Sequence, residues 1–506
     1  MKIGLISFLL VFLSCSRWEY EDLSIESLES FPETYLSLIS VDTIFARTDS
    51  IGNVIYSFDE THDSLHVWDT IANAFNTIST SRQKLSWWGE DVDGNVVGYY
   101  YKWSSDSIWT YTHLESGTFF VPIRSSLDLF FFEVKAVDDQ GNIDSTASKL
   151  ILPIKNSAPE IQFRYRSNPL IANLNSDTSY TFPTRTFIWD SYDQDGNETI
   201  TDVFYALNDT CDTCWIRLDG NAMSITLKQL YIGPNTFFLK CKDIAGASSL
   251  TIKFPDSSRP SEAQHWIVKP IMGDILIVDD YPLDNSNNVL SWYSSMMDTL
   301  YGDQAYSFWE IGDELPYSAT DVSANLNYFK NVFWFAAYNN TASASDTYNG
   351  AEASLVNFIM EGGNLFMNPI DFEDTTFTWF PLDSLITLNP NGRLFPGRVI
   401  ESPIDSTLNL EVSHLIAVKV KGFWPKSDNF EITKDLYRMA DPLSGDGWVG
   451  NPTVCSIGQY RISPLELSGK IVLMTLPLHD GYRAKLQGNG SSIKLFQYLL
   501  EEEFNN

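Results

Sequence analysis

Positive charge is scarce in this chain. Lys and Arg together number 33 against 65 Asp and Glu in 506 residues, which gives a formal net charge of −32. A field of that sign repels nucleic acid and anionic lipid. The composition therefore argues against a nucleic-acid partner and against a protein held to membranes by a basic surface. An acidic surface keeps a protein soluble, and it can also collect divalent cations.

Long apolar runs are also lacking. Beyond residue 15 no segment reaches the ~18 consecutive apolar residues that a transmembrane helix needs, so the body of the protein is expected to lie outside the membrane. Hydrophobic residues nevertheless make up 44% of the chain and aromatic residues 14%, which is enough for packed cores. At ~150 residues per domain, the length predicts roughly three domains.

Cysteine is rare, with five residues in the chain. Cys211 and Cys214 form a C-x-x-C motif in a polar stretch that is typical of a hairpin loop. A zinc site would need two further ligands, and a thioredoxin-like site would need a helix after the motif. In an oxidising compartment the pair predicts a local disulfide, with free thiols or a metal as alternatives. Cys241 and Cys455 lie in strand-like runs and are expected to be buried.

The first 15 residues have the pattern of a secretory signal. Lys2 gives a positive start, residues 3–13 are apolar, and a small residue, Ser14, precedes Cys15. The segment resembles a bacterial lipoprotein signal, although Phe12 stands where that family prefers Leu, Val or Ile. The resemblance implies cleavage behind Ser14, lipidation of Cys15, and anchoring in the bacterial cell envelope, at the outer membrane or cell surface. An ordinary cleaved signal is the alternative. Residues 16–30 would then be a tether.

Two segments of the chain repeat each other. Trp87 and Trp189 are each followed, in the same register, by an Asp-x-Asp-Gly-Asn turn and then by an aromatic strand. Further on, residues 130–138 parallel residues 237–243, and each segment is followed by a glycine turn. Short alternating strands with frequent turns predict two tandem β-sandwiches, over residues 31–155 and 156–257. They resemble the fibronectin type III or immunoglobulin-like modules of secreted bacterial proteins.

The two repeated turns are rich in aspartate. Asp91 and Asp93 in the first, and Asp193 and Asp195 in the second, offer the hard oxygen ligands that calcium prefers. The ligand count is below the six to eight that calcium takes, so tight turns that need Gly and Asn are the simpler interpretation. No other cofactor is indicated.

The hydrophobic pattern changes from short alternating strands to apolar runs and helical segments after a Pro- and Ser-rich linker, which is expected at residues 258–269. Residues 275–280 and 332–338 form apolar runs typical of buried parallel strands, and helical patterns follow at 286–300 and 351–361. A third strand is expected at 364–367, a further strand at 470–478 and a closing helix at 491–503. Strands alternating with helices predict a doubly wound, parallel-sheet α/β domain over residues 270–506.

This order of elements resembles the class I glutamine-amidotransferase-like, or flavodoxin-like, superfamily, in particular its non-catalytic branch. The resemblance implies a nucleophile on the turn after the third strand, but that turn reads Asn368-Pro369-Ile370-Asp371 and has neither Cys nor Ser. Cys455 and His479 are the alternative nucleophile and base, although the usual spacing between them is absent.

Acidic residues follow the predicted strands of this domain. Asp279, Asp280, Asp371 and His479 are expected near the carboxyl ends of the strands, where open parallel sheets bind ligands. They would hold a metal or a cationic group, or they simply cap helices and end strands. Aromatic residues in the expected loop region 371–451 are either binding anchors or a local core. The sequence favours a lipid-anchored, non-catalytic binding or scaffold protein with a protein or glycan ligand. The alternative is an envelope hydrolase acting on glycans or peptides through this crevice.

Overall fold

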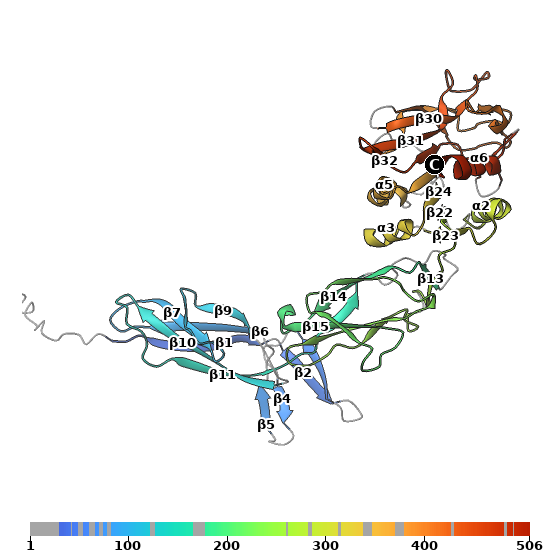
Figure 1. Ribbon diagram of the computed structural model, residues 1–506. Coiled ribbons are helices and arrows are strands. Elements are labelled where there is room, and N and C mark those ends of the chain that lie inside the picture. Colours follow the sequence, from blue (N-terminus) through green and yellow to red (C-terminus); the bar gives the residue numbers. More distant parts are fainter. Residues whose placement is uncertain are drawn as a thin grey trace, which may run out of the picture.

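The structure is a computed structural model and consists mostly of strands (Figure 1). It describes residues 30–41, 43–48, 54–59, 66–69, 74–77, 82–121, 127–164, 178–259, 262–281, 286–311, 315–336, 347–369, 379–426, 430–479, 483–488 and 490–505. In chain order, a first sandwich, a second sandwich and a helix-flanked sheet follow one another.

The first sandwich packs a sheet of order β1-β6-β9 against one of order β11-β10-β7-β8. Between them lies an aromatic core in which Trp87 contacts Tyr99, Phe119 and Phe132. The strands of these two sheets are β1 (Glu33–Val41), β6 (Arg82–Glu90), β7 (Val96–Trp103), β8 (Thr110–Thr112), β9 (Ser116–Phe120), β10 (Leu127–Asp138) and β11 (Ser148–Lys155).

Two hairpins interrupt the first sandwich between β1 and β6, and the repeat in the sequence does not predict them. Strand β2 (Thr43–Thr48) pairs with β3 (Val54–Asp59), and β4 (His66–Asp69) pairs with β5 (Ala74–Thr77), all antiparallel. The hairpins extend from the side of the elongated molecule between the two sandwiches (Figure 1).

The second sandwich is built in the same way. Strand β19 alternates buried and half-buried residues along its length, as a strand with one face in a core must. Phe187, Trp189, Phe237 and Trp266 are buried in that core. The strands are β12 (Glu160–Phe163), β13 (Thr178–Thr181), β14 (Arg185–Tyr192), β15 (Ile200–Leu207), β16 (Ile216–Asp219), β17 (Ser224–Leu227), β18 (Gly233–Pro234), β19 (Phe237–Asp243), β20 (Ile252–Phe254) and β21 (His265–Val268), with one 3-10 helix, η1 (Asn197–Thr199).

Strand β21 corrects the expected linker at 258–269. It pairs with β13 and β18, and Trp266 on it is buried in the core of the second sandwich. Proline and serine before β21 suggested a linker, but the apolar alternation of only four residues was too short to be recognised as a strand.

Five parallel strands form the centre of the third body, in the order β23-β22-β24-β25-β33. Every residue of β24, β25 and β33 is buried, because helices cover both faces of the sheet. Helices α2 and α6 share one core with the sheet, and α3 and α5 share the other. The elements are β22 (Ile275–Asp280), α2 (Ser286–Tyr301), β23 (Tyr306–Glu310), α3 (Ala319–Asn327), β24 (Asn331–Ala336), α4 (Thr347–Gly350), α5 (Glu352–Met360), β25 (Asn364–Pro369), β33 (Ile471–Met474), α6 (Ser492–Tyr498) and the π-helical turn η3 (Leu499–Glu503).

Antiparallel strands extend this sheet beyond β33 and correct the expected loop region at 371–451. Strand β31 pairs with β33, and β30 with β31, so the sheet is mixed and not purely parallel. Pro, Gly and aromatic residues interrupt the apolar runs of this region. The hydrophobic pattern therefore did not predict these strands. They are β26 (Leu382–Thr387), β27 (Val399–Glu401), β28 (Leu410–Val412), β29 (Lys421–Pro425), β30 (Phe430–Met439), β31 (Thr453–Ser463), β32 (Glu466–Leu467) and β34 (Leu486–Gln487), with the 3-10 helix η2 (Ser406–Leu408).

Candidate functional sites

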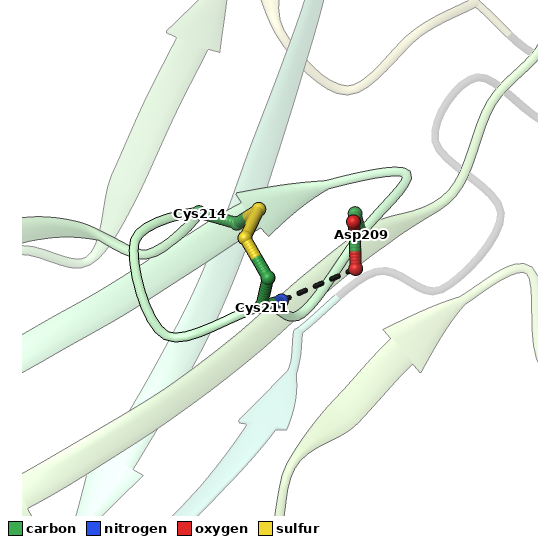
Figure 2. Close-up of side chains that lie close together, drawn as sticks. All are labelled: Asp209, Cys211 and Cys214. Atoms are coloured by element: carbon green, nitrogen blue, oxygen red, sulfur yellow. Dashed lines mark hydrogen bonds between the residues drawn. A yellow bond between two sulfur atoms is a disulfide. The ribbon is translucent and has the colours of Figure 1, made fainter.

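Cys211 and Cys214 form a disulfide in the loop between β15 and β16, with Cα atoms 5.1 Å apart (Figure 2). Asp209 lies beside them and accepts a hydrogen bond from the Cys211 backbone N–H at 3.2 Å. Within the described ranges, these three residues are the one group whose His, Cys, Asp or Glu ligand atoms lie close enough for a shared metal ion. Because both sulfurs are used in the disulfide and a strand follows, the motif pins a hairpin.

The acidic turn of the first sandwich is open to solvent. Asp93 is exposed, and its carboxylate accepts hydrogen bonds from the Ser30 hydroxyl and from the Ser30 backbone N–H, the latter at 3.0 Å. These bonds lower the pKa of Asp93. The Ser30 hydroxyl also lies 3.0 Å from Asp91. The two carboxylates therefore fix the start of the first sandwich through Ser30.

The corresponding turn of the second sandwich is buried. Asp193 is 2% exposed and Asp195 is fully buried. Asp193 Oδ1 accepts a hydrogen bond from the Asp195 backbone N–H at 2.9 Å, whereas Asp193 Oδ2 is buried without a hydrogen-bond partner. Burial, with the nearby charges of Asp195 and Asp243, raises the pKa of Asp193 to about 6.

Asp243, at the end of β19, belongs to the same cluster and is not among the candidate residues expected from the sequence. Its carboxylate is 2% exposed and accepts hydrogen bonds from the Ala247 backbone N–H at 2.8 Å and from the Asn156 amide at 2.6 Å. A signal was available, because the paralleled segments 130–138 and 237–243 both end in aspartate. Asp138 likewise accepts a hydrogen bond from the backbone N–H of Asn142, at 2.7 Å.

At the carboxyl edge of the parallel strands, Tyr281 bonds to Asp279 through its backbone and to His479 through its hydroxyl. The Tyr281 backbone N–H donates to Asp279 Oδ1 at 3.1 Å, and its hydroxyl donates to the His479 carbonyl at 2.8 Å. Asp279 is 1% exposed, its Oδ2 has no hydrogen-bond partner, and burial raises its pKa well above the usual value. The His479 ring lies 5.2 Å from the ring of Trp292.

The other two crevice candidates do not complete this arrangement. Asp280 accepts a hydrogen bond from the Trp334 indole at 2.9 Å, which gives it a structural partner. Asp371 lies outside the described residues, as does Cys15. Asp279 and His479 are therefore linked only through the two ends of Tyr281, and no direct contact joins their side chains among the interactions of the described residues.

The structure corrects the expected turn at residues 368–371, because Asn368 and Pro369 belong to strand β25 itself, and residues 370–378 lie outside the described residues. Asn368, near the end of β25, is buried, and its amide donates to the carbonyls of Met474 and Leu476, both at 2.8 Å. These bonds hold the chain that leaves β33. The alternative nucleophile, Cys455, is fully buried inside β31, and burial raises its pKa well above that of an ordinary thiol. Neither position supplies an accessible thiolate.

Aromatic residues of the expected loop region divide between core and surface. Trp379, Phe423 and Trp448 are buried and belong to the cores of the third body. Phe395 and Trp424 are exposed, at 49% and 43%. Most of this set therefore serves as core, and two side chains remain available as surface contacts.

A buried polar contact joins the second sandwich to the helix-flanked sheet. Asp321, in the first turn of α3, accepts hydrogen bonds from the Thr186 backbone N–H at 2.9 Å and from its hydroxyl at 2.6 Å. The buried guanidinium of Arg185 packs on the rings of Phe187, Phe254 and Trp266 at 4.1–4.8 Å. Burial lowers the pKa of Arg185 to about 9, and the charge of Asp321 opposes that shift. Phe182 is buried in a core of the third body.

No known family and no curated protein matches the chain. Similar solved structures include fibronectin(III)-like modules of CbhA from Clostridium thermocellum, with 11% identity over 46% of this chain and 94% of that chain, at a TM-score of 0.17. They also include a two-domain fibronectin type III segment of chicken tenascin, with 13% identity over 35% and 93%, at a TM-score of 0.20. The central fibronectin-III array of RIM-binding protein matches at 10% identity over 38% and 67%, with a TM-score of 0.15. At these values the matches assign no family.

Strand pairing and cores nevertheless define the class of molecule: two consecutive β-sandwiches followed by a mixed sheet with helices on both faces. Within the part of the chain that the structure describes, no helix is both long and apolar enough to cross a membrane.

Proposed function

We propose that this chain is a lipid-anchored protein of the bacterial cell envelope that binds a protein or glycan and does not catalyse a reaction. Its two sandwiches act as a stalk of fibronectin type III or immunoglobulin-like modules. The third body is an α/β domain related to the non-catalytic amidotransferase-like proteins. Its strand order, with the first strand placed between the second and the third, supports that relationship.

The extracytoplasmic location is supported by two independent features. The first 15 residues have the pattern of a lipoprotein signal, and the Cys211–Cys214 disulfide suits an oxidising compartment. The net charge of −32 repels anionic lipid and nucleic acid, so a lipid on Cys15, not a basic surface, would hold the protein at the membrane.

The observation that best supports a binding role is the structural role of Asn368, whose amide bonds to two backbone carbonyls. Acyl transfer through a cysteine needs an exposed thiolate with a base beside it. In this chain Asn368, near the end of the third strand, holds an amide whose hydrogens are bound to two backbone carbonyls, and the residues that follow, Pro369-Ile370-Asp371, include neither Cys nor Ser. The carboxyl edge of the parallel strands then remains as a surface where a ligand would bind without reacting.

The test is to assay the purified full-length protein in detergent with glutamine, with a nitrophenyl ester and with envelope glycan and peptide fragments. The proposal predicts no turnover above the rate of the Cys455→Ser variant. Turnover that disappears in Cys455→Ser or His479→Ala, with circular dichroism unchanged, would contradict it.

A hydrolase remains the second candidate, because one observation favours it. Asp279 has an unpartnered oxygen and a raised pKa, which together are typical of a general acid. If the domain is an enzyme of this kind, Asp279→Asn abolishes hydrolysis while the exposed Asp274→Asn, just before the same strand, retains it. Equal rates in the two variants exclude this role for Asp279.

A further inference from the structure

A pair of exposed aromatic rings lies on the outer face of the first sandwich. Strands β1 and β6 pair side by side there, and Tyr35 lies opposite Trp88 in their register (Figure 1). The two rings are nearly parallel, with centroids 5.4 Å apart and planes that differ by 16°. Tyr35 is 37% exposed and Trp88 is 44% exposed, whereas Trp87, the residue before it on β6, is buried in the core. A stacked pair therefore presents its ring surface to solvent.

Two carboxylates flank the rings on the same face of the sheet. Glu33 lies two residues before Tyr35, Glu90 lies two residues after Trp88, and the two glutamates are directly opposite each other. Both glutamates are exposed. The Tyr35 hydroxyl donates to Glu33 Oε2 at 3.0 Å. This bond, together with the charges of Glu33 and Glu90, raises the pKa of Tyr35, so both carboxylates act on the aromatic pair.

Packing within the sheet does not account for this arrangement. Cross-strand stacking of the rings stabilises the two strands, but like charges directly opposite each other destabilise a sheet. Among the described residues, no Lys or Arg forms an ion pair with Glu33 or Glu90. The face thus combines exposed aromatic rings, whose electron-rich faces attract cations, with uncompensated negative charge. Both features favour a cationic partner.

An arginine side chain suits this face better than other ligands. Its guanidinium is flat, so it stacks on a Trp or Tyr ring while its N–H groups donate to a carboxylate. The lysine ammonium is a more strongly hydrated point charge and cannot stack in this way. Calcium takes six to eight oxygen ligands and gains nothing from a ring. A neutral sugar would stack on the rings but would gain little from the two negative charges.

We propose that the Tyr35–Trp88 face binds a protein partner through an arginine side chain, which stacks on the ring pair and donates to Glu33 or Glu90. The net charge of −32 assists the encounter, because it attracts basic segments toward this protein. This face belongs to the first sandwich, so its binding does not depend on the lipid anchor or on the role of the third body.

The experiment uses the full-length protein in detergent, labelled with fluorotryptophan, and follows its 15 tryptophans by fluorine NMR. The Trp88 resonance is assigned by its loss in Trp88→Phe. The probe is a Gly-Arg-Gly-Arg-Gly peptide with blocked ends, and the matched peptide carries neutral citrulline in place of each arginine. We expect the arginine peptide to shift the Trp88 resonance saturably and the citrulline peptide to leave it in place. Trp424, which is also exposed, should respond to neither peptide.

Variants separate the contribution of the ring from that of the charge. Trp88→Ala removes the stacking surface and Glu90→Gln removes one charge, so each should weaken calorimetric binding of the arginine peptide by about threefold or more. Tyr111→Ala removes another exposed ring of the same sandwich, and Glu160→Gln neutralises an exposed carboxylate of the second sandwich. These two controls should bind the peptide like the wild type. Circular dichroism confirms that each variant is folded.

Three results overturn the proposal. The arginine peptide leaves the Trp88 resonance unchanged, the citrulline peptide shifts it equally, or the folded Trp88→Ala or Glu90→Gln variant binds the arginine peptide as tightly as the wild type. A Trp88 resonance that responds to cellotetraose or chitotetraose, and not to the arginine peptide, also overturns the proposal and assigns this face to glycans.

Discussion

At the scale of single residues, buried acids are the distinctive feature of this protein. Asp193 and Asp279 are both nearly inaccessible, each has one satisfied and one unsatisfied oxygen, and burial raises the pKa of each. The sequence shows that Asp193 and Asp195 follow a core tryptophan, but it does not show that the turn is folded inward. Asp93, the equivalent of Asp195, is followed by the same Gly-Asn pair and is exposed, although both carboxylates accept a hydrogen bond from a serine N–H in the segment before their sandwich.

The pKa of Asp193 predicts an effect of pH on stability. Its folded-state pKa is raised from 3.8 to about 6, beside Asp195, Asp243 and the Cys241 thiol. A raised carboxyl pKa stabilises the folded state fully below about pH 4, and that contribution is lost as pH rises through 6. At ~1.4 kcal/mol per pKa unit, the loss is about 3 kcal/mol.

Urea unfolding at pH 4 and pH 7 measures this effect. At pH 7 Asp193→Asn should be more stable than the wild type, because the variant buries no charge at this position, and the difference should shrink at pH 4. Asp219→Asn, which changes an exposed aspartate, should follow the wild type at both pH values. An Asp193→Asn variant that is equally less stable than the wild type at both pH values would be inconsistent with the buried charge as we describe it.

Cys455 gives a second prediction at this scale. Because the side chain is fully buried with a raised pKa, the native thiol should not react with a thiol reagent until the protein unfolds. Cys455→Ser places a hydroxyl in an apolar core and should lower the free energy of unfolding by about 1–3 kcal/mol. Rapid labelling of Cys455 in the native protein would contradict its assigned place.

At the scale of elements, the clearest predictions from the sequence were the strands buried on both faces. Continuous apolar runs predict β22 and β24 to within a few residues, because a strand covered by helices on both faces buries every position. The antiparallel strands from β26 to β30 could not be predicted in this way. Their pairing depends on partners distant in the chain, and local Pro and Gly residues look like loop signals.

One acidic residue, Glu503, binds the C-terminal helical segment to the mixed sheet. Glu503 in η3 accepts hydrogen bonds from Lys434 on β30 at 2.7 Å, from Tyr498 at 2.7 Å and from Lys470 at 3.1 Å. Burial by itself raises the pKa of Glu503, but these three partners outweigh it and lower the pKa to about 2. The pairing stabilises the protein above pH 4.5, and the contribution is lost as pH falls through about 2.

Glu503→Gln should therefore destabilise the protein by about 2–3 kcal/mol at pH 7 and by much less at pH 2. Chemical denaturation at the two pH values measures the difference. The control is Glu466→Gln, on the exposed side of β32, which should change stability little at either pH. If the two variants behave alike at pH 7, Glu503 does not fasten the helix.

At the scale of the whole molecule, the joint between the second sandwich and the third body is a packed interface. Phe182 is buried among residues of the third body, and Asp321 on α3 binds Thr186 beside the buried Arg185. The sequence placed a linker where β21 completes the second sandwich. The contact between Thr186 and Asp321 joins side chains 135 positions apart, so no local sequence pattern could predict it.

This interface predicts that the second sandwich and the third body unfold together. Asp321→Ala leaves the buried N–H and hydroxyl donors of Thr186 without an acceptor and removes the negative charge that acts on Arg185, which should cost about 1–3 kcal/mol and separate the two transitions. Asp274→Asn, with its exposed side chain, is the control. Differential scanning calorimetry should show one shared transition in the wild type and two in Asp321→Ala. Separate transitions already present in the wild type would show that the interface does not couple the two bodies.

The proposed anchoring of the whole molecule in the cell envelope depends on Cys15. The most direct test is intact-protein mass spectrometry of the membrane fraction, after growth with a clickable fatty-acid analogue, for the wild type and for Cys15→Ala. We predict a wild-type chain that begins at Cys15, carries a diacylglyceryl modification and is labelled, and a Cys15→Ala chain that is unlabelled and no longer processed at that position. An unlabelled wild-type chain, or a Cys15→Ala chain of the same mature size that still carries the label, would contradict the proposal that this protein is lipid-anchored.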